Sequence, residues 1–388
     1  MIQKSPRHRI SPRAAALGAL IAGLGFGVGL GSAWPAASAA SSPTTLADRG
    51  LVVSQPRLAP HVDAAALDSL AALASDAPDV ATRLAIAPLR ELVRDAVAAV
   101  DPLTMQLAGG LLVERIGAHV DTALEVLELA RGSFSPSELE LLFRAVALSD
   151  AAKDPRVVDA LLAIAADPEL DARKHMGAVL TLQTQPSLSE GTQARLMKLA
   201  SNVAAPELGS AVAGVLGSVV QHDPDNAPLY TSSLLSLARS ETTPVRVAAL
   251  ESLMTNELLL DAPSADDVSA IARSDSSPQA RAAAVASLAV NPDKAKVLDT
   301  YAQLFASEPE PYVRWNILVG AVRASSAAAL PLLHQFAAQD PYFAEDVADF
   351  DTILASGERD FEKVWLAKRA ADERAGRTRP WEGEESVD

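Results

Sequence analysis

The stretch "SSPQARAAAVASLAV", residues 276–290, decides how the rest of the chain is interpreted. Pro278 fits the first position of a helix, and the serine before it can cap the helix N-terminus. Counted from Arg281, the apolar residues Val285 and Leu288 follow at +4 and +7, which places them on one helix face. The preceding "DVSAIARSD" predicts another helix that ends at a polar turn. The segment therefore predicts a helix, a short turn and a second helix.

The same order of features recurs along the chain at a nearly constant spacing. One position near the start of each second helix aligns the units, and the intervals between successive copies are 36, 37, 35 and 33 residues. An apolar residue stands nine or ten positions before each copy, in the first helix. A single helix pair cannot bury its own apolar face, so regular repetition of pairs is typical of stacked repeat proteins. The aligned residues are Arg173, Gly209, Arg246, Arg281 and Arg314.

The pattern predicts an all-α fold, namely an α-solenoid of stacked antiparallel helix pairs. Aromatic residues make up only 4% of the chain, which suits close-packed helices better than a β-sandwich. The repeats fit best over residues 155–322, and a weaker upstream unit places Arg83 ten residues after Leu73. No long linker interrupts the pattern, so we expect one elongated domain over residues 61–367. A charged, partly disordered tail is expected over residues 368–388.

The units resemble HEAT repeats, and the segments "TTPVRVAALESL" (242–253) and "EPYVRWNILVGA" (310–321) match that family best. The family pattern is a first helix, a turn rich in Asp and Pro, and a Val-Arg pair that opens a second helix. The resemblance implies a superhelix of the HEAT or armadillo type. It also implies that the repeated arginine supports stacking between neighbouring units, and Gly209 in its place predicts a looser or bent stack. The arginines concerned are Arg83, Arg173, Arg246, Arg281 and Arg314.

Residues 1–39 have the composition of a secretory signal peptide. Four basic and no acidic residues occupy the first 13 positions, the stretch from Ala14 to Trp34 is uncharged, and small residues follow. We expect cleavage after Ala39 and a flexible linker over residues 40–60, so that the protein works in a bacterial periplasm or outside the cell. The alternative is an uncleaved segment that anchors the protein in the inner membrane, because the 21 uncharged residues could span a bilayer.

The charge and the residue types present exclude several classes of function. The formal net charge is −16, whereas phosphate binding needs clustered Lys and Arg, so we expect no nucleic-acid partner. The chain has no cysteine, which excludes disulfides, thiolate nucleophiles and cysteine-based zinc sites. None of the six histidines has the spacing of a helical metal site. We therefore expect no catalytic residue, no metal and no cofactor.

Aromatic residues are concentrated near the C-terminus. After the signal peptide there are 14 aromatics, and 11 of them follow residue 300. Tyrosine and tryptophan are common where binding energy is concentrated, so these residues are candidates for contact with a partner. The alternative is a bulky cap that closes the open end of an alanine-lined stack. The candidate partner-binding residues are Tyr312, Trp315, Tyr342 and Phe343.

The sequence therefore predicts an exported, non-enzymatic scaffold that presents an extended surface to a protein or peptide partner. We expect a monomer that does not insert into the membrane after signal cleavage. Two alternatives belong to other classes. One is a HEAT-like enzyme of the lyase type, because this repeat fold does not exclude catalysis. The other is a carrier of an apolar ligand such as lipid, held between alanine- and leucine-lined helices.

Overall fold

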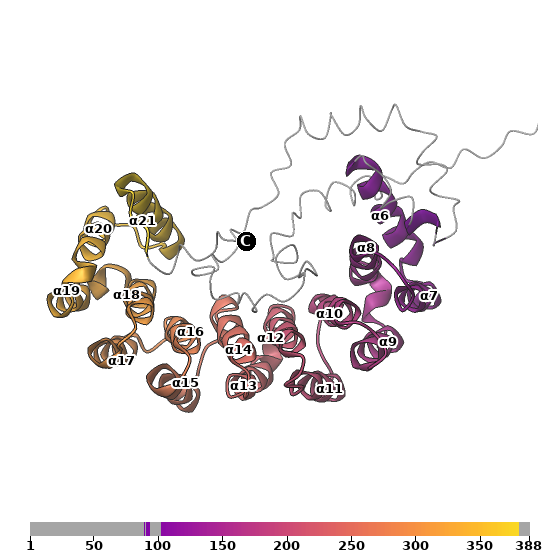
Figure 1. Cartoon of the computed structure of the whole chain (residues 1–388), viewed down its shortest axis with the longest axis horizontal. Helices are drawn as coiled ribbons and strands as arrows, with labels where there is room; N and C mark the ends of the chain where they lie inside the picture. The colour runs from indigo at the N-terminus through magenta and orange to yellow at the C-terminus, as the bar shows by residue number, and fades with distance from the viewer. Residues whose placement is uncertain (1–88, 90, 94–101, 380–388) are drawn as a thin grey trace, which may run out of the picture. The chain divides into compact units, whose positions relative to one another are not determined.

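The structure, a computed structural model, describes residue 89, residues 91–93 and residues 102–379. Within this part of the chain the backbone forms sixteen α-helices, joined by turns and short 3₁₀ segments, and no strand (Figure 1). The predicted all-α class is confirmed. The expected signal peptide, the expected linker and Arg83 lie outside the described residues.

The described residues divide into two compact units, one that ends at Pro186 and one that begins at Ser187, whereas the sequence predicts one continuous domain. In the first unit, each helix packs against the next one or the next but one along the chain. The contacting pairs include α7 with α8 and α9, and α8 with α10. Its elements are α6 (Pro102–Ile116), α7 (Val120–Ala130), α8 (Pro136–Ala147), η2 (Asp150–Lys153), α9 (Pro155–Ala166), α10 (Ala172–Thr181) and η3 (Leu182–Thr184).

The second unit contains eleven of the described α-helices. They are α11 (Glu190–Ala200), α12 (Pro206–Val220), α13 (Ala227–Leu237), α14 (Thr243–Thr255), α15 (Ala262–Ser274), α16 (Pro278–Leu288), α17 (Lys294–Ser307), α18 (Pro311–Ser325), α19 (Leu330–Gln339), α20 (Ala344–Ala355) and α21 (Phe361–Ala375). Short 3₁₀ segments are η4 (Pro224–Asn226), η5 (Ser326–Ala329) and η6 (Pro341–Phe343). Within this unit α12, α14, α16 and α18 pack against one another in succession, and each also packs against the helix before it (Figure 1).

Local signals in the sequence account for where these helices begin. The stretch around residue 281 forms α16, which starts at Pro278, and the Ser277 hydroxyl accepts a hydrogen bond from the Ala280 N–H at 3.3 Å. Proline suits the first helical turn because its missing N–H would have no helical partner there. At the start of α8, Ser135 and Glu138 form a reciprocal capping box. The helix–turn–helix boundaries predicted from this pattern follow from such caps.

Small residues let the second helices of the pairs approach one another closely. In α16 the residues from Ala282 to Leu288 are all buried, so this helix is covered on every face. Gly209 of α12 faces α14: a Cβ atom there would lie 2.6 Å from Val245 and 3.1 Å from the Ala200 carbonyl. The looser stack expected at Gly209 is therefore wrong. The glycine lets α12 and α14 approach so closely that a side chain at position 209 would not fit between them.

One described stretch, Pro311–Gln339, is long and apolar enough to cross a membrane by length and composition alone. It consists of α18 and α19 with the 3₁₀ segment η5 between them. Half of its most apolar window is buried within the protein, and Arg314 inside it is paired with Asp340. These are the properties of core helices in a packed helical domain.

Candidate functional site

Three of the predicted arginine anchors make the same contact, which we call the arginine bridge. In each, a guanidinium at the start of a second helix pairs with the acidic residue that ends the first helix of the following pair. The bridges are Arg246–Asp275 (2.8 and 2.9 Å), Arg281–Glu308 (2.8 and 2.7 Å) and Arg314–Asp340 (2.8 Å). Two parallel N–H···O bonds make the first two bridges stronger and more directional than a single contact.

Two of the bridges, those of Arg246 and Arg281, also involve the turn of the arginine's own helix pair. Arg246 Nη1 donates to the Ser240 carbonyl at 3.0 Å, and Arg281 Nη1 donates to the Asp275 carbonyl at 2.9 Å. Asp275 therefore serves two arginines, with its carboxylate for Arg246 and its carbonyl for Arg281. The hydrogen bond to Glu308 raises the pKa of Arg281 above its ordinary value. These arginines tie consecutive turns together, which is the contact expected of residues that hold neighbouring pairs in register.

Arg173 in the first unit is arranged differently. Its backbone N–H donates to the Asp171 carboxylate, while the adjacent Lys174 is the buried cation. Lys174 Nζ donates to the Arg131 carbonyl at 3.2 Å and lies 3.3 Å from Asp171. The guanidinium of Arg131 pairs with Asp167. Lys174, one position after Arg173, and Arg131, one helix pair earlier, thus make the linking contacts expected of Arg173.

The four predicted partner-binding aromatics divide into two groups. Tyr342 is 53% exposed and Tyr312 is half-buried, so both lie at the surface. Trp315 is only 4% exposed and Phe343 is fully buried. Neither ring is open at the surface as predicted, because both pack inside the protein, and contact of Trp315 with a partner stays a prediction. The Phe343 ring lies edge-on to Phe305, with centroids 5.8 Å apart.

The aromatic residues of the last helices fill the interior, as the cap alternative requires. Phe305 stacks on Phe336 with centroids 4.1 Å apart. Trp315 lies 6.4 Å from Phe350 and 6.3 Å from Trp365, centroid to centroid. Such ring pairs contribute about 0.5–1.5 kcal/mol each beyond the area they bury. This group therefore stabilises the packing of α17 to α21.

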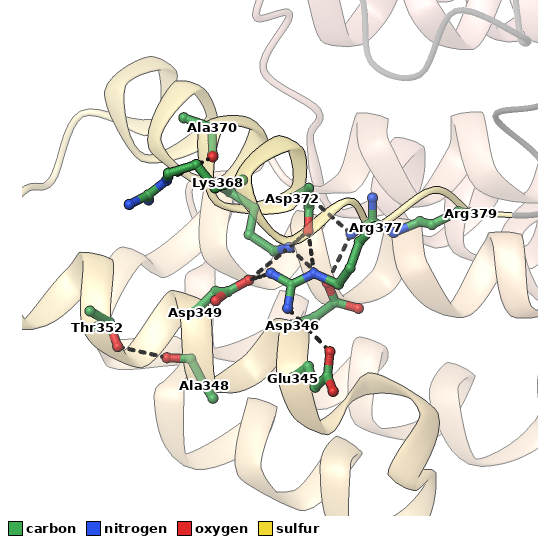
Figure 2. Close-up of polar contacts among 11 residues, drawn as sticks. Glu345, Asp346, Ala348, Asp349, Thr352, Lys368, Ala370, Asp372, Arg377 and Arg379 are labelled. Carbon is green, nitrogen blue, oxygen red and sulfur yellow. Dashed lines mark hydrogen bonds and ion pairs between the residues drawn. The ribbon is translucent and has the colours of Figure 1, made fainter.

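A buried charge cluster lies between α20 and α21 and is the most elaborate polar site of the described residues (Figure 2). Lys368 is fully buried, and its ammonium nitrogen lies 2.7 Å from Asp346, 3.2 Å from Asp349 and 2.5 Å from Asp372. The two helices place these groups by simple spacing: Asp346 and Asp349 are three apart on α20, and Lys368 and Asp372 are four apart on α21. A lysine can be buried in this way only because its charge is paired.

Two arginines beyond the end of α21 complete the cluster. Arg377 Nε donates to Asp372 at 2.9 Å and Nη1 to Glu345 at 3.2 Å, and the same guanidinium contacts Asp349. Arg379 Nη2 donates to Asp346 at 2.8 Å and to Asp372 at 3.1 Å. Four carboxylates thus meet three cations in one place.

Trp315 forms the apolar floor of this cluster. The guanidinium carbon of Arg379 lies 3.8 Å from the centroid of the Trp315 ring, and Lys368 Nζ lies 5.5 Å from it. Both distances are those of cation–π contacts. We call Trp315, Glu345, Asp346, Asp349 and Asp372 the acidic cradle.

Three carboxylates of the cradle, those of Asp346, Asp349 and Asp372, lie close enough together to suggest a metal site. The ammonium of Lys368 already stands among them at hydrogen-bonding distance, so the cation at this centre is a side chain. Burial raises the pKa of Asp372, but the hydrogen bond and charge of Lys368, with help from Arg379 and Arg377, outweigh it and leave the pKa below its usual value. Asp372 is therefore ionised at neutral pH and acts as a fixed counter-ion.

Sequence reasoning did not find this cluster. Abundant carboxylates such as those of "EDVADFD", residues 345–351, are typical of solvated helix faces, and the sequence predicts a charged, partly disordered tail that starts at Lys368. The start of the tail is corrected: α21 runs on to Ala375, and the chain is packed as far as Arg379, which is 8% exposed. The sequence signal for this cluster is the spacing of its charged residues: Asp346 and Asp349 are three apart on one helix, and Lys368 and Asp372 are four apart on the next.

The comparisons with known proteins give no family for this chain. No protein-family model matches it, and no curated protein matches it at a significant level. The likeness to HEAT repeats therefore depends on the residues and contacts of the chain itself.

Proposed function

We propose that the protein is an exported α-solenoid of the HEAT type that acts as a non-enzymatic scaffold and binds a protein or peptide partner. The observation that carries this proposal is the repeated arginine bridge between consecutive helix pairs. A structure built by repeating one contact grows in length without forming an enclosed centre, and repeat proteins of this kind use their extended faces for binding.

The polar groups of the described residues support binding rather than chemistry. In the arginine bridges and in the acidic cradle, each acid pairs with a cation of the same chain. A hollow of about 420 Å³ beside α15 is lined largely by polar residues, among them Arg239, Asp267 and Ser274. Such a lining does not suit lipid or another apolar ligand, because burying apolar groups against it leaves polar groups without water.

The elongated architecture is tested by small-angle X-ray scattering of the exported chain. A globular protein of 349 residues, the length left after cleavage at Ala39, has a radius of gyration of about 20 Å. We expect a clearly larger radius and a long tail in the distance distribution. A radius near 20 Å would contradict the solenoid.

The binding function is tested by reconstitution. The tagged exported chain is used to capture partners from the exported fraction, and each captured protein is then purified and titrated by calorimetry. We expect a stoichiometric complex that the double substitution Tyr312→Ala/Tyr342→Ala weakens at least tenfold, about 1.4 kcal/mol. The matched control is Leu229→Ala on α13, also an exposed apolar residue, which should leave the affinity unchanged. A chain that binds no purified protein, or that turns over a small molecule, contradicts the proposal.

A further inference from the structure

The last described residues form a short strap that folds back on the acidic cradle. Helix α21 ends where Gly376 takes a left-handed conformation, with φ at 63°, and the Arg377 N–H donates to the Asp372 carbonyl at 2.9 Å. This turn reverses the chain toward the cradle. The strap, residues 376–379, then places two arginines, Arg377 and Arg379, on the same carboxylate group (Figure 2).

The guanidinium of Arg379 is bound on its face and on its edge, as a ligand in a binding site would be. Its guanidinium stacks on Trp315 at 3.8 Å and is hydrogen-bonded to Asp346 and Asp372 on its edge. An aromatic face with carboxylates at its rim is the arrangement that recognises a planar guanidinium, and a lysine ammonium fits it less well. These contacts come from three helices, α18, α20 and α21, and none of them comes from the strap itself.

The charge of the cradle favours a cationic occupant. Its four carboxylates carry −4, and Lys368 reduces this to −3. Arg377 and Arg379 together bring the total to −1. The strap therefore supplies two of the three positive charges, and any group that displaces it must bring the same two charges at the same spacing.

We propose that the acidic cradle is a recognition site for an Arg-x-Arg segment of a partner protein, and that the strap occupies it as a competing intramolecular ligand. This inference rests on the proposed function, since it names the chemistry of the partner. An intramolecular ligand on a short connection has an effective concentration in the millimolar range, so the intact chain binds a free peptide weakly. A partner with a second contact elsewhere on the scaffold can overcome that competition.

The test uses the full exported chain and a fluorescent peptide, acetyl-Gly-Arg-Thr-Arg-Gly-amide, with fluorescence anisotropy as the readout. The strap variant Arg377→Gln/Arg379→Gln is expected to bind the peptide with a dissociation constant at least tenfold lower than that of the unchanged chain. The same peptide with lysines in place of arginines is expected to bind the strap variant at least fivefold more weakly. Adding Asp346→Asn to the strap variant is expected to abolish binding.

The matched control is Arg369→Gln/Arg374→Gln, which removes the same charge from exposed positions of α21. It is expected to change the affinity less than twofold. An unchanged affinity in the strap variant, or an equal gain in the control, overturns the proposal, because the effect would then be absent or due to net charge.

A second measurement uses the unchanged chain in case the strap variant fails to fold by circular dichroism. The Nε–H signals of Arg377 and Arg379 are followed by NMR during addition of the peptide to millimolar concentration. Movement of both signals toward solvent values supports displacement, and unmoved signals overturn it. The peptide assay needs no natural partner, so its failure refutes the strap proposal alone, whereas failure of the reconstitution experiment refutes the scaffold.

Discussion

The arginine bridges and the acidic cradle both pair arginine with carboxylate, but they differ in what each pair is connected to. A bridge such as Arg281–Glu308 joins one guanidinium to one acid, and the next bridge repeats it one helix pair later. In the cradle, Lys368 alone contacts three aspartates, and two of those aspartates also bind Arg379. The bridges are a series of separate contacts, whereas the cradle is one connected network.

The two arrangements suit different parts of the molecule. A series of separate bridges can continue for any number of helix pairs, because each involves only its neighbours. A connected network buries its charges at one place and depends on every member, because removing one leaves the others uncompensated. The middle of the second unit therefore repeats, and its C-terminal end is closed by charges that repeat nowhere else among the described residues.

The strongest test of this contrast is Lys368→Met. The substitution keeps the volume of the side chain but leaves two buried carboxylates, Asp346 and Asp372, and the half-buried Asp349 without their central cation. We expect the free energy of unfolding to fall by about 3–5 kcal/mol, measured by urea denaturation. Lys363→Met on the same helix is the control: that side chain is 67% exposed and lies 3.7 Å from Glu358, so its loss should cost under about 0.5 kcal/mol. Equal effects would mean that the cluster is not a network.

The second test breaks a single bridge with Arg281→Met. Glu308, whose side chain is nearly buried, then loses both of its bonds to the guanidinium. We expect a loss of about 3 kcal/mol in unfolding free energy, part of which Glu308→Gln restores in a double-mutant cycle. Arg273→Met, at an exposed position of α15, should have no measurable effect. Additive single and double substitutions would show that the two side chains are not coupled.

The third test concerns the close approach at Gly209, where the repeat lacks its arginine. Gly209→Ala introduces a methyl group 2.6 Å from Val245, so we expect a loss of about 2 kcal/mol by thermal or urea unfolding. Gly191→Ala, on an open face of α11, should instead stabilise the protein by about 0.5–1 kcal/mol, since it lowers the entropy of the unfolded chain. A neutral result at Gly209 would mean that α12 and α14 can separate without cost.

The smallest effect is expected at Glu251 of α14, a half-buried acid whose carboxyl has no hydrogen bond or ion pair to the described residues. Burial raises its pKa from 4.5 to about 7. A raised acid pKa means that the folded protein binds the proton more tightly, so stability is lost as pH rises from about 4.5 to 7. Glu251→Gln should therefore stabilise the protein at pH 8 by about 1 kcal/mol and remove this part of the pH dependence. Carbon-13 NMR titration of Glu251 checks the pKa, and an ordinary value near 4.5 would contradict the prediction.

The all-α class and the helix boundaries near residue 281 could be predicted because local signals determine them. Proline at the first helical position and serine before it act within one turn of helix. The arginine positions followed from the repeat, and three of them stand in bridges. Arg173 did not follow the rule, because the neighbouring Lys174 reaches the carbonyl of Arg131 instead.

The cradle could not be predicted from the same patterns, because its members come from three helices and a strap. Trp315 reads as an exposed binding residue in the sequence, yet Phe350 and Trp365 from later helices cover it. Lys368 reads as the start of a solvated tail, yet aspartates of α20 surround it. Only the fold of the last helices brings these residues together.

The repeated geometry of the bridges has a consequence for how a protein of this kind can change in length. Arg246 stands 35 residues before Arg281, and each guanidinium meets an acid at the same place in the next pair. If a genetic deletion removed one such 35-residue segment, Arg246 would take the place of Arg281 and could pair with Glu308. The same holds for a duplication, which would add a pair together with its own bond. Gene rearrangement can therefore shorten or lengthen the middle of the chain in whole units, while the cradle at the end, with its single set of partners, must be inherited intact.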